Sequence, residues 1–78
     1  MTILTPESCR AGRAILKWSV RNLGAQSGVS FNTIILFENG RPMRTSTAIK
    51  IINAFAAQGV EITNGDGTGA RLKHRKSD

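Results

Sequence analysis

The stretch SVRNLGAQSGVSFNTIILFENG, residues 19–40, decides the fold because it predicts two short helices joined by a tight turn. Gly28 is placed to end a first helix over residues 20–27, since glycine adopts the left-handed conformation without a Cβ penalty. A second helix is expected over residues 31–38, and Ser30 is placed to cap it. Because the connection is so short, we expect the two helices to cross steeply, with the second projecting outward.

Further elements are expected on both sides of this stretch. Thr5–Glu7 combines a cap, a first-turn proline and an acidic residue, which predicts a helix over residues 6–17. Another helix is expected over residues 44–58, with Gly59 ending it. Alternation in VEIT and ARL predicts a short hairpin over residues 60–72.

These elements indicate one domain. Its expected range is residues 1–78, with a basic tail over residues 73–78. The predicted class is mainly α: a small bundle of four or five helices with a short C-terminal β-hairpin.

Apolar residues recur at helical spacing and predict an inward face for each helix. Trp18 is expected to anchor the core, because an isolated tryptophan is not an array for stacking bases. Gly12 lies mid-helix at a cost of about 1 kcal/mol relative to alanine, and we expect another helix to approach it closely. The other expected inward residues are Cys9, Leu16 with Ile15 alongside, Leu23, Gly24, Val29, Ile34, Phe37, Ala48, Ile51, Ile52, Ala54 and Phe55.

The charge of the chain points to a polyanionic partner. Its formal net charge is +6, with 11 Lys and Arg residues against 5 Asp and Glu residues. An excess of this size favours DNA, RNA or an anionic membrane surface, and the alternative is a solvated basic surface without a specific partner. Together with the short turn between two helices, it favours nucleic acid.

Other classes of site lack support in the sequence. Cys9 is the only cysteine, which excludes an internal disulfide and a cysteine-based zinc site. The single histidine, His74, lies in the expected tail, and there is no Ser/His/Asp set or carboxylate cluster. We therefore expect no enzymatic activity, no metal and no cofactor. No basic segment precedes an apolar one at the start, and no apolar run is long enough to span a membrane, so neither a signal peptide nor a span is expected.

The helix pair resembles the helix-turn-helix of the Cro/repressor-like family, also called xenobiotic-response-element-like regulators. The likeness is carried by Ser19, Leu23, the turn Gly28–Ser30, Thr33, Ile34 and the ending Phe37–Arg41. The flanking LKWS, AAQG, GVEIT and GARLK are similar to a small bacterial or phage-derived subgroup, so that the resemblance covers roughly residues 5–73. It implies a lambda-repressor-like domain that binds duplex DNA and regulates transcription, as a homodimer, at a cytoplasmic, nucleoid-associated location.

In such a domain the second helix of the pair enters the major groove, with its N-terminal residues on base edges. The expected base contacts are Ser30, Phe31, Asn32, Ile35 and Leu36. Among them, Asn32 suits adenine and Phe31 suits a thymine methyl group. The expected phosphate contacts are Arg21, Asn39, Arg41 and Arg44. The resemblance also implies a structural ion pair between Arg13 and Glu38.

Two places depart from the family's pattern. Val20 stands where the family often has a phosphate-binding glutamine, and Ile35 and Leu36 stand where polar or arginine side chains are usual. Either the helix over residues 31–38 uses methyl and shape readout, or its apolar outer face binds a protein. The alternative function is therefore a protein-interaction adaptor or antitoxin-like module.

Overall fold

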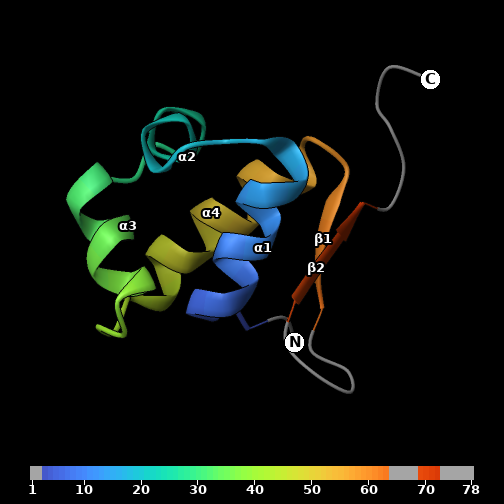
Figure 1. Cartoon of the computed structure of the whole chain (residues 1–78). Helices are drawn as coiled ribbons and strands as arrows, with labels where there is room; N and C mark the ends of the chain where they lie inside the picture. Colours follow the sequence, from blue (N-terminus) through green and yellow to red (C-terminus); the bar gives the residue numbers. More distant parts are fainter. Residues whose placement is uncertain (1–2, 64–68, 73–78) are drawn as a thin grey trace.

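Four helices surround one core, and a two-stranded sheet packs against one end of them (Figure 1). The computed structural model describes residues 3–63 and 69–72. The elements are α1 (Pro6–Leu16), α2 (Val20–Ser27), α3 (Phe31–Glu38), α4 (Thr45–Ala56), β1 (Val60–Thr63) and β2 (Gly69–Leu72). The predicted mainly helical class with a small antiparallel sheet is confirmed. Residues 64–68 of the expected hairpin and the expected basic tail over residues 73–78 lie outside the described residues.

Local signals at the helix ends explain where the first helices begin. The Thr5 hydroxyl accepts from the Ser8 amide at 3.1 Å, and the Ser8 hydroxyl accepts from the Thr5 amide at 2.9 Å, which closes a capping box at α1. The Ser19 hydroxyl accepts from the Asn22 amide at 3.0 Å and caps α2. Ser30 precedes α3 as predicted, but its side chain forms no capping hydrogen bond. The expected Ser30 side-chain cap is therefore wrong.

Two predicted helices are longer than the observed ones. The first ends at Leu16 because Lys17 adopts a left-handed conformation with φ 57° and donates its amide back to carbonyls of the last turn. The fourth begins at Thr45, since Arg44 is extended, and it ends at Ala56, from which a turn leads to Gly59 with φ 82°. The bounds of α2 and α3 are as predicted.

The core lies between α1, α2, α3 and α4 and extends under β1. Gly12 is packed so tightly that an added Cβ would lie 2.7 Å from Cζ of Phe55. The group that approaches Gly12 is therefore the ring of an α4 side chain, whereas the sequence predicted the close approach of a helix. Trp18 stacks on the same ring with the centroids 6.0 Å apart, as a core anchor does. One expectation needs correction: Ile15 is exposed, because it lies on the solvent side of α1. Leu4, which was not among the expected inward residues, is buried.

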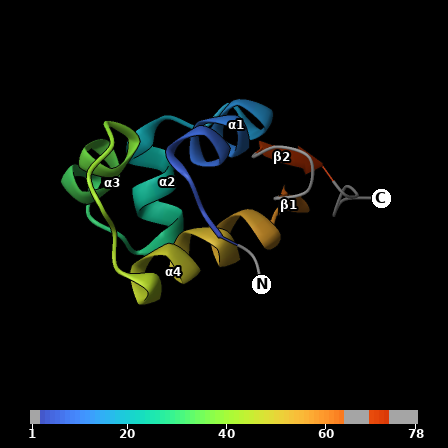
Figure 2. The ribbon, with the colours of Figure 1, turned by 90° about the horizontal axis from the view of Figure 1, so that it is seen from below.

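The hairpin completes the core at the end of the molecule away from α3, as Figures 1 and 2 both show. β1 and β2 pair antiparallel, with Val60 opposite Leu72 and Ile62 opposite Ala70. Val60 and Ile62 are buried, whereas the residues between and after them are half-buried, so the predicted alternation is confirmed in β1. Because the sheet packs on α1 and α4, it leaves α2 and α3 uncovered on their outer sides.

None of the helices in the described part of the chain is long and apolar enough to cross a membrane.

Candidate functional site

A tight turn holds α2 and α3 against each other. Gly28 ends α2 with φ 75°, and its amide donates to the carbonyl of Gly24 at 2.9 Å. The Ser27 hydroxyl donates to the Leu23 carbonyl at 2.7 Å and accepts from the Val29 amide at 3.3 Å. An added Cβ on Gly24 would lie 3.0 Å from the Val29 carbonyl oxygen. The turn therefore fixes α3 relative to α2 through its backbone, and it leaves little room for a side chain at residue 24.

An ion pair fixes the other end of α3. Arg13 Nη2 lies 2.7 Å from Glu38 Oε1, and Arg13 Nε lies 2.9 Å from Glu38 Oε2, so the guanidinium binds the carboxylate with two donors. Arg13 Nη1 also donates to the Trp18 carbonyl at 3.1 Å. The pair implied by the resemblance is present in the structure, and it joins α1, the α1–α2 link and the last turn of α3.

Two further donors meet Glu38, and sequence reasoning missed both. The Cys9 thiol donates to Glu38 Oε2 at 3.1 Å, and Arg10 Nη1 donates to the Glu38 carbonyl at 2.6 Å. Burial and the hydrogen bond to Glu38 raise the pKa of the Cys9 thiol well above its usual range, so it stays protonated at neutral pH. No pattern in the sequence pairs Cys9 with Glu38. The implied ion pair between Arg13 and Glu38 was the one signal that placed this carboxylate near the first helix.

The carboxyl group of Glu38 is held in its charged form. Burial raises the pKa of Glu38, but hydrogen bonds from Arg13 and Cys9 and the nearby charges of Arg13 and Arg10 outweigh that effect. The net result is a pKa below the ordinary value of 4.5. The cluster is therefore a structural clamp on α3 and not a group poised to exchange protons near neutral pH.

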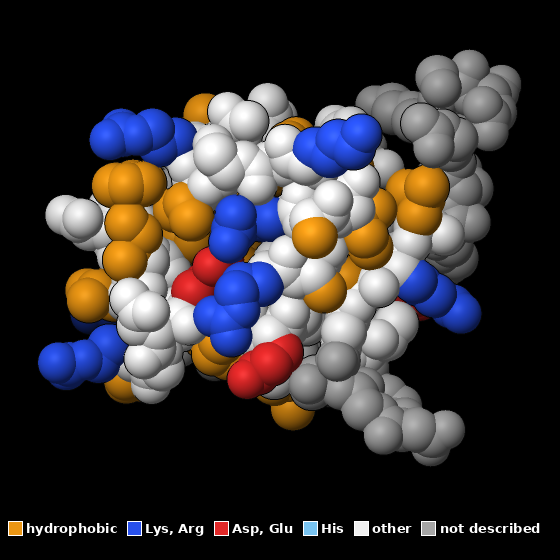
Figure 3. Space-filling view, in the orientation of Figure 1, with side chains coloured by type: hydrophobic (Ala, Val, Ile, Leu, Met, Phe, Trp, Pro, Cys, Tyr) orange, Lys and Arg blue, Asp and Glu red, His pale blue; other side chains and the backbone are white. Residues whose placement is uncertain are grey.

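The outer side of α3 carries the predicted base-contact residues. Ser30, Asn32 and Leu36 are exposed, Leu36 to 52%, while Phe31 and Ile35 are half-buried. The inner side of α3 is buried in the core. Figure 3 shows hydrophobic side chains along this edge of the molecule, with basic side chains at both ends of the row. Four of the five predicted residues thus lie on this accessible helix, and Ser30 immediately precedes it.

The basic groups that flank α3 in the sequence are accessible. Arg21, Arg41 and Arg44 are exposed, and none of them belongs to an ion pair within residues 3–63 and 69–72. The Arg21 guanidinium carbon lies 4.3 Å from the centroid of the Phe31 ring. Asn39 is exposed at the C-terminal cap of α3. No carboxylate in the described part of the chain pairs with these three arginines, which suits an anionic ligand.

An open hollow of about 500 Å³ lies beside α3, lined by Thr33, Leu36, Arg41 and Pro42. It brings the predicted phosphate contact Arg41 next to the predicted base contact Leu36. Thr33, which is half-buried, was not among the predicted contacts. Arg44 lies outside this hollow, at the N-terminal end of α4.

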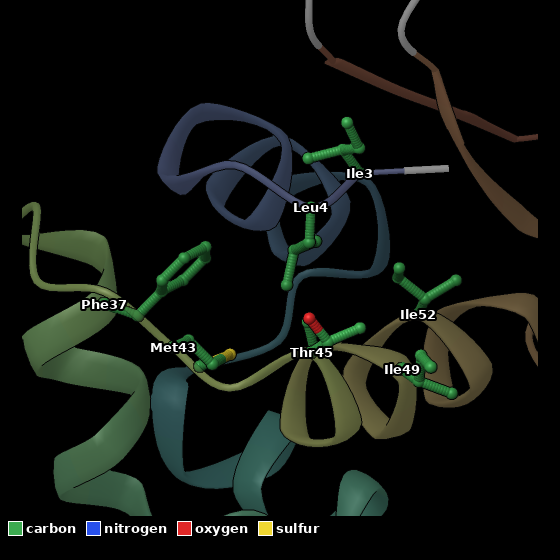
Figure 4. A pocket seen from close by; sticks show the side chains of 8 residues that line it. Ile3, Leu4, Phe37, Met43, Thr45, Ile49 and Ile52 are labelled. Atoms are coloured by element: carbon green, nitrogen blue, oxygen red, sulfur yellow. The ribbon is translucent and has the colours of Figure 1, made fainter. Parts of the chain in front are cut away.

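A second concavity is an apolar groove of about 350 Å³ between the N-terminal segment, the end of α3 and α4 (Figure 4). It is lined by Ile3, Leu4, Phe37, Met43, Thr45, Ala48, Ile49 and Ile52. None of these described lining residues has a titratable side chain, so they offer shape and apolar surface.

Comparison with models of known protein families found no match, and comparison with curated proteins found none either.

Proposed function

We propose that this chain is a small transcriptional regulator that binds duplex DNA at specific sequences, with α2 and α3 as a lambda-repressor-like helix-turn-helix. The observation that supports this function most is the environment of α3 in the folded chain. Its outer side is accessible, exposed arginines lie at its two ends, and Glu38 clamps its inner side to α1. A short exposed helix with cations around it fits the major groove, whose phosphates lie on both sides.

In this arrangement α3 lies in the major groove and the flanking groups lie on the phosphates. Asn32 is the proposed reader of adenine, because its amide offers a donor and an acceptor on one edge. Ser30, which immediately precedes α3, is a further proposed base contact, and Ile35 and Leu36 offer methyl groups to thymine. The proposed phosphate contacts are Arg21, Asn39, Arg41 and Arg44.

The same proposal includes a homodimer of this chain and a cytoplasmic, nucleoid-associated location. A paired chain would select an inverted repeat, because two-fold symmetry in the protein is mirrored in its site. A selection from random duplexes reports this directly through the symmetry of the recovered sequence.

Binding should depend on salt through the arginines that follow α3. We expect Arg41→Ala and Arg44→Ala each to weaken binding to every duplex sequence, because each removes one group that binds a phosphate. The slope of log K against log salt should become shallower by about 0.9 for each phosphate that the variant no longer neutralises. Fluorescence anisotropy on a labelled duplex at several salt concentrations measures both effects.

Asn32→Ala is the matched control for these two variants. It should keep the salt slope and relax the preference at one base pair by about 1–3 kcal/mol, since it removes hydrogen bonds to a base and no charge. If both arginine variants bind every duplex as the unaltered chain does, this docking of α3 is wrong.

A second candidate function is a protein-interaction module that uses the outer side of α3. The observation in its favour is the 52% exposure of Leu36 on the same helix as half-buried Ile35 and Phe31. We expect Leu36→Asp to abolish capture of such a partner, because a carboxylate would face apolar surface there. The adaptor function requires that the unaltered chain captures a defined partner without salt-dependent DNA binding. A partner that is still captured by Leu36→Asp does not use this face.

A further inference from the structure

The aromatic ring at the start of α3 and a cation at the start of α2 form one unit. The Arg21 guanidinium carbon lies 4.3 Å from the centroid of the Phe31 ring, a cation–π contact. Arg21 is the second residue of α2 and Phe31 is the first of α3. The contact therefore bridges the N-terminal turns of the two helices.

The cation–π contact restricts the Arg21 side chain without neutralising its charge. No ion pair in the described part of the chain includes Arg21, so its charge is not compensated by a carboxylate there. The N–H donors of Arg21 make no hydrogen bond within the residues that the structure describes, and its contact with Phe31 is a cation–π contact of the guanidinium carbon with the ring. Arg21 is thus held in place while its donors remain available to an anion.

The neighbouring residue explains why this role falls to Arg21. Val20, at the first position of α2, packs against the core and has no side-chain donor. Arg21 is therefore the first side chain of α2 that can donate to a phosphate. Because it is long and exposed, it would lose rotamer freedom on binding unless another group ordered it beforehand.

We propose that Phe31 is a positioning residue that holds Arg21 against a DNA phosphate at the edge of the major groove, and that it does not read a base. The inference rests on the proposed function. It changes the role of Phe31 from a contact with a thymine methyl group to the support of a phosphate contact made from α2.

The test compares Arg21→Ala, Phe31→Leu, Phe31→Tyr and the double variant Arg21→Ala/Phe31→Leu on one duplex between about 50 and 200 mM salt. Affinity falls as the salt concentration rises from about 50 to 200 mM. A variant that lacks one phosphate-binding group should show a fall about threefold smaller than that of the unaltered chain. We expect this change for Arg21→Ala and Phe31→Leu, and no further change in the double variant. Phe31→Tyr keeps the ring and should restore the slope of the unaltered chain. Arg71→Ala, in the hairpin at the other end of the molecule, is the control and should keep that slope.

Random-duplex selection with Phe31→Leu provides the second readout. The recovered sequence should stay the same, because a positioning residue of a phosphate contact carries no base information. A variant that keeps the slope but loses a thymine preference would overturn the inference and make Phe31 a base reader, with the proposed function intact. Absence of salt-dependent duplex binding by the unaltered chain would overturn both the inference and the proposed function.

Discussion

Arg13→Ala is expected to lower the free energy of unfolding by about 3–5 kcal/mol, because it leaves a mostly buried carboxylate without its main partner. The side chains of Arg13 and Glu38 are only 19% and 9% exposed, and two guanidinium donors bind the carboxylate. The Cys9 thiol remains as a hydrogen-bond donor, but it brings no charge. A loss of this size is a large part of the total of about 5–15 kcal/mol that is usual for a folded domain.

The chain offers a matched control in its exposed ion pair. Arg71 Nε lies 2.8 Å from Glu61 Oε1, with the two side chains 67% and 39% exposed. Arg71→Ala should therefore change the free energy of unfolding by no more than about 1 kcal/mol. Urea unfolding followed by circular dichroism compares the two variants directly. Equal midpoints for Arg13→Ala and Arg71→Ala would show that the pair in the core has no special role.

The same pair should make the fold sensitive to acid. Since the folded pKa of Glu38 lies below the ordinary value of 4.5, the unfolded chain takes up the proton first as the pH falls. The stability that this carboxylate contributes is therefore complete above that value and is lost as the pH falls through the folded pKa. Repeating the urea unfolding at decreasing pH should show a smaller acid-dependent loss in Arg13→Ala than in the unaltered chain.

The sequence predicted the elements that depend on neighbouring residues. The ends of α2 and α3 were correct because Ser19, Gly28 and the glycine after Asn39 act within one turn of the chain. The inward faces followed from helical spacing, and the alternation of Val60 and Ile62 followed from the period of a strand. These signals fix local geometry and need no knowledge of distant residues.

The contacts that define the candidate site depend on side chains far apart in the sequence. The Cys9 thiol donates to a carboxylate 29 residues away, and the Arg21 guanidinium makes a cation–π contact with Phe31 across the turn. Spacing places each of these residues on a face, but it does not say which side chain from another helix lies opposite. Leu4 was missed for the same reason, because an extended segment has no periodicity that reveals its burial.

Gly12→Val should give the second large loss of stability, about 2–3 kcal/mol, because it forces extra atoms into a filled core. An added Cβ would lie 2.7 Å from Cζ and 2.9 Å from both Cε atoms of Phe55. That ring is fully buried and stacks on Trp18, so it cannot move aside freely. Valine has a better helix propensity than glycine, but the gain of under about 1 kcal/mol is smaller than the expected clash.

A double variant separates the clash from any effect of valine on the helix itself. Phe55→Leu removes the ring atoms that an added Cβ would meet, at the expense of a cavity when it is made alone. Because the two changes are complementary in volume, Gly12→Val/Phe55→Leu should be more stable than the sum of the single losses predicts, by about 1–2 kcal/mol. Urea unfolding of the four chains measures this coupling. Strictly additive losses would mean that the contact between α1 and α4 at Gly12 is not the reason for the glycine.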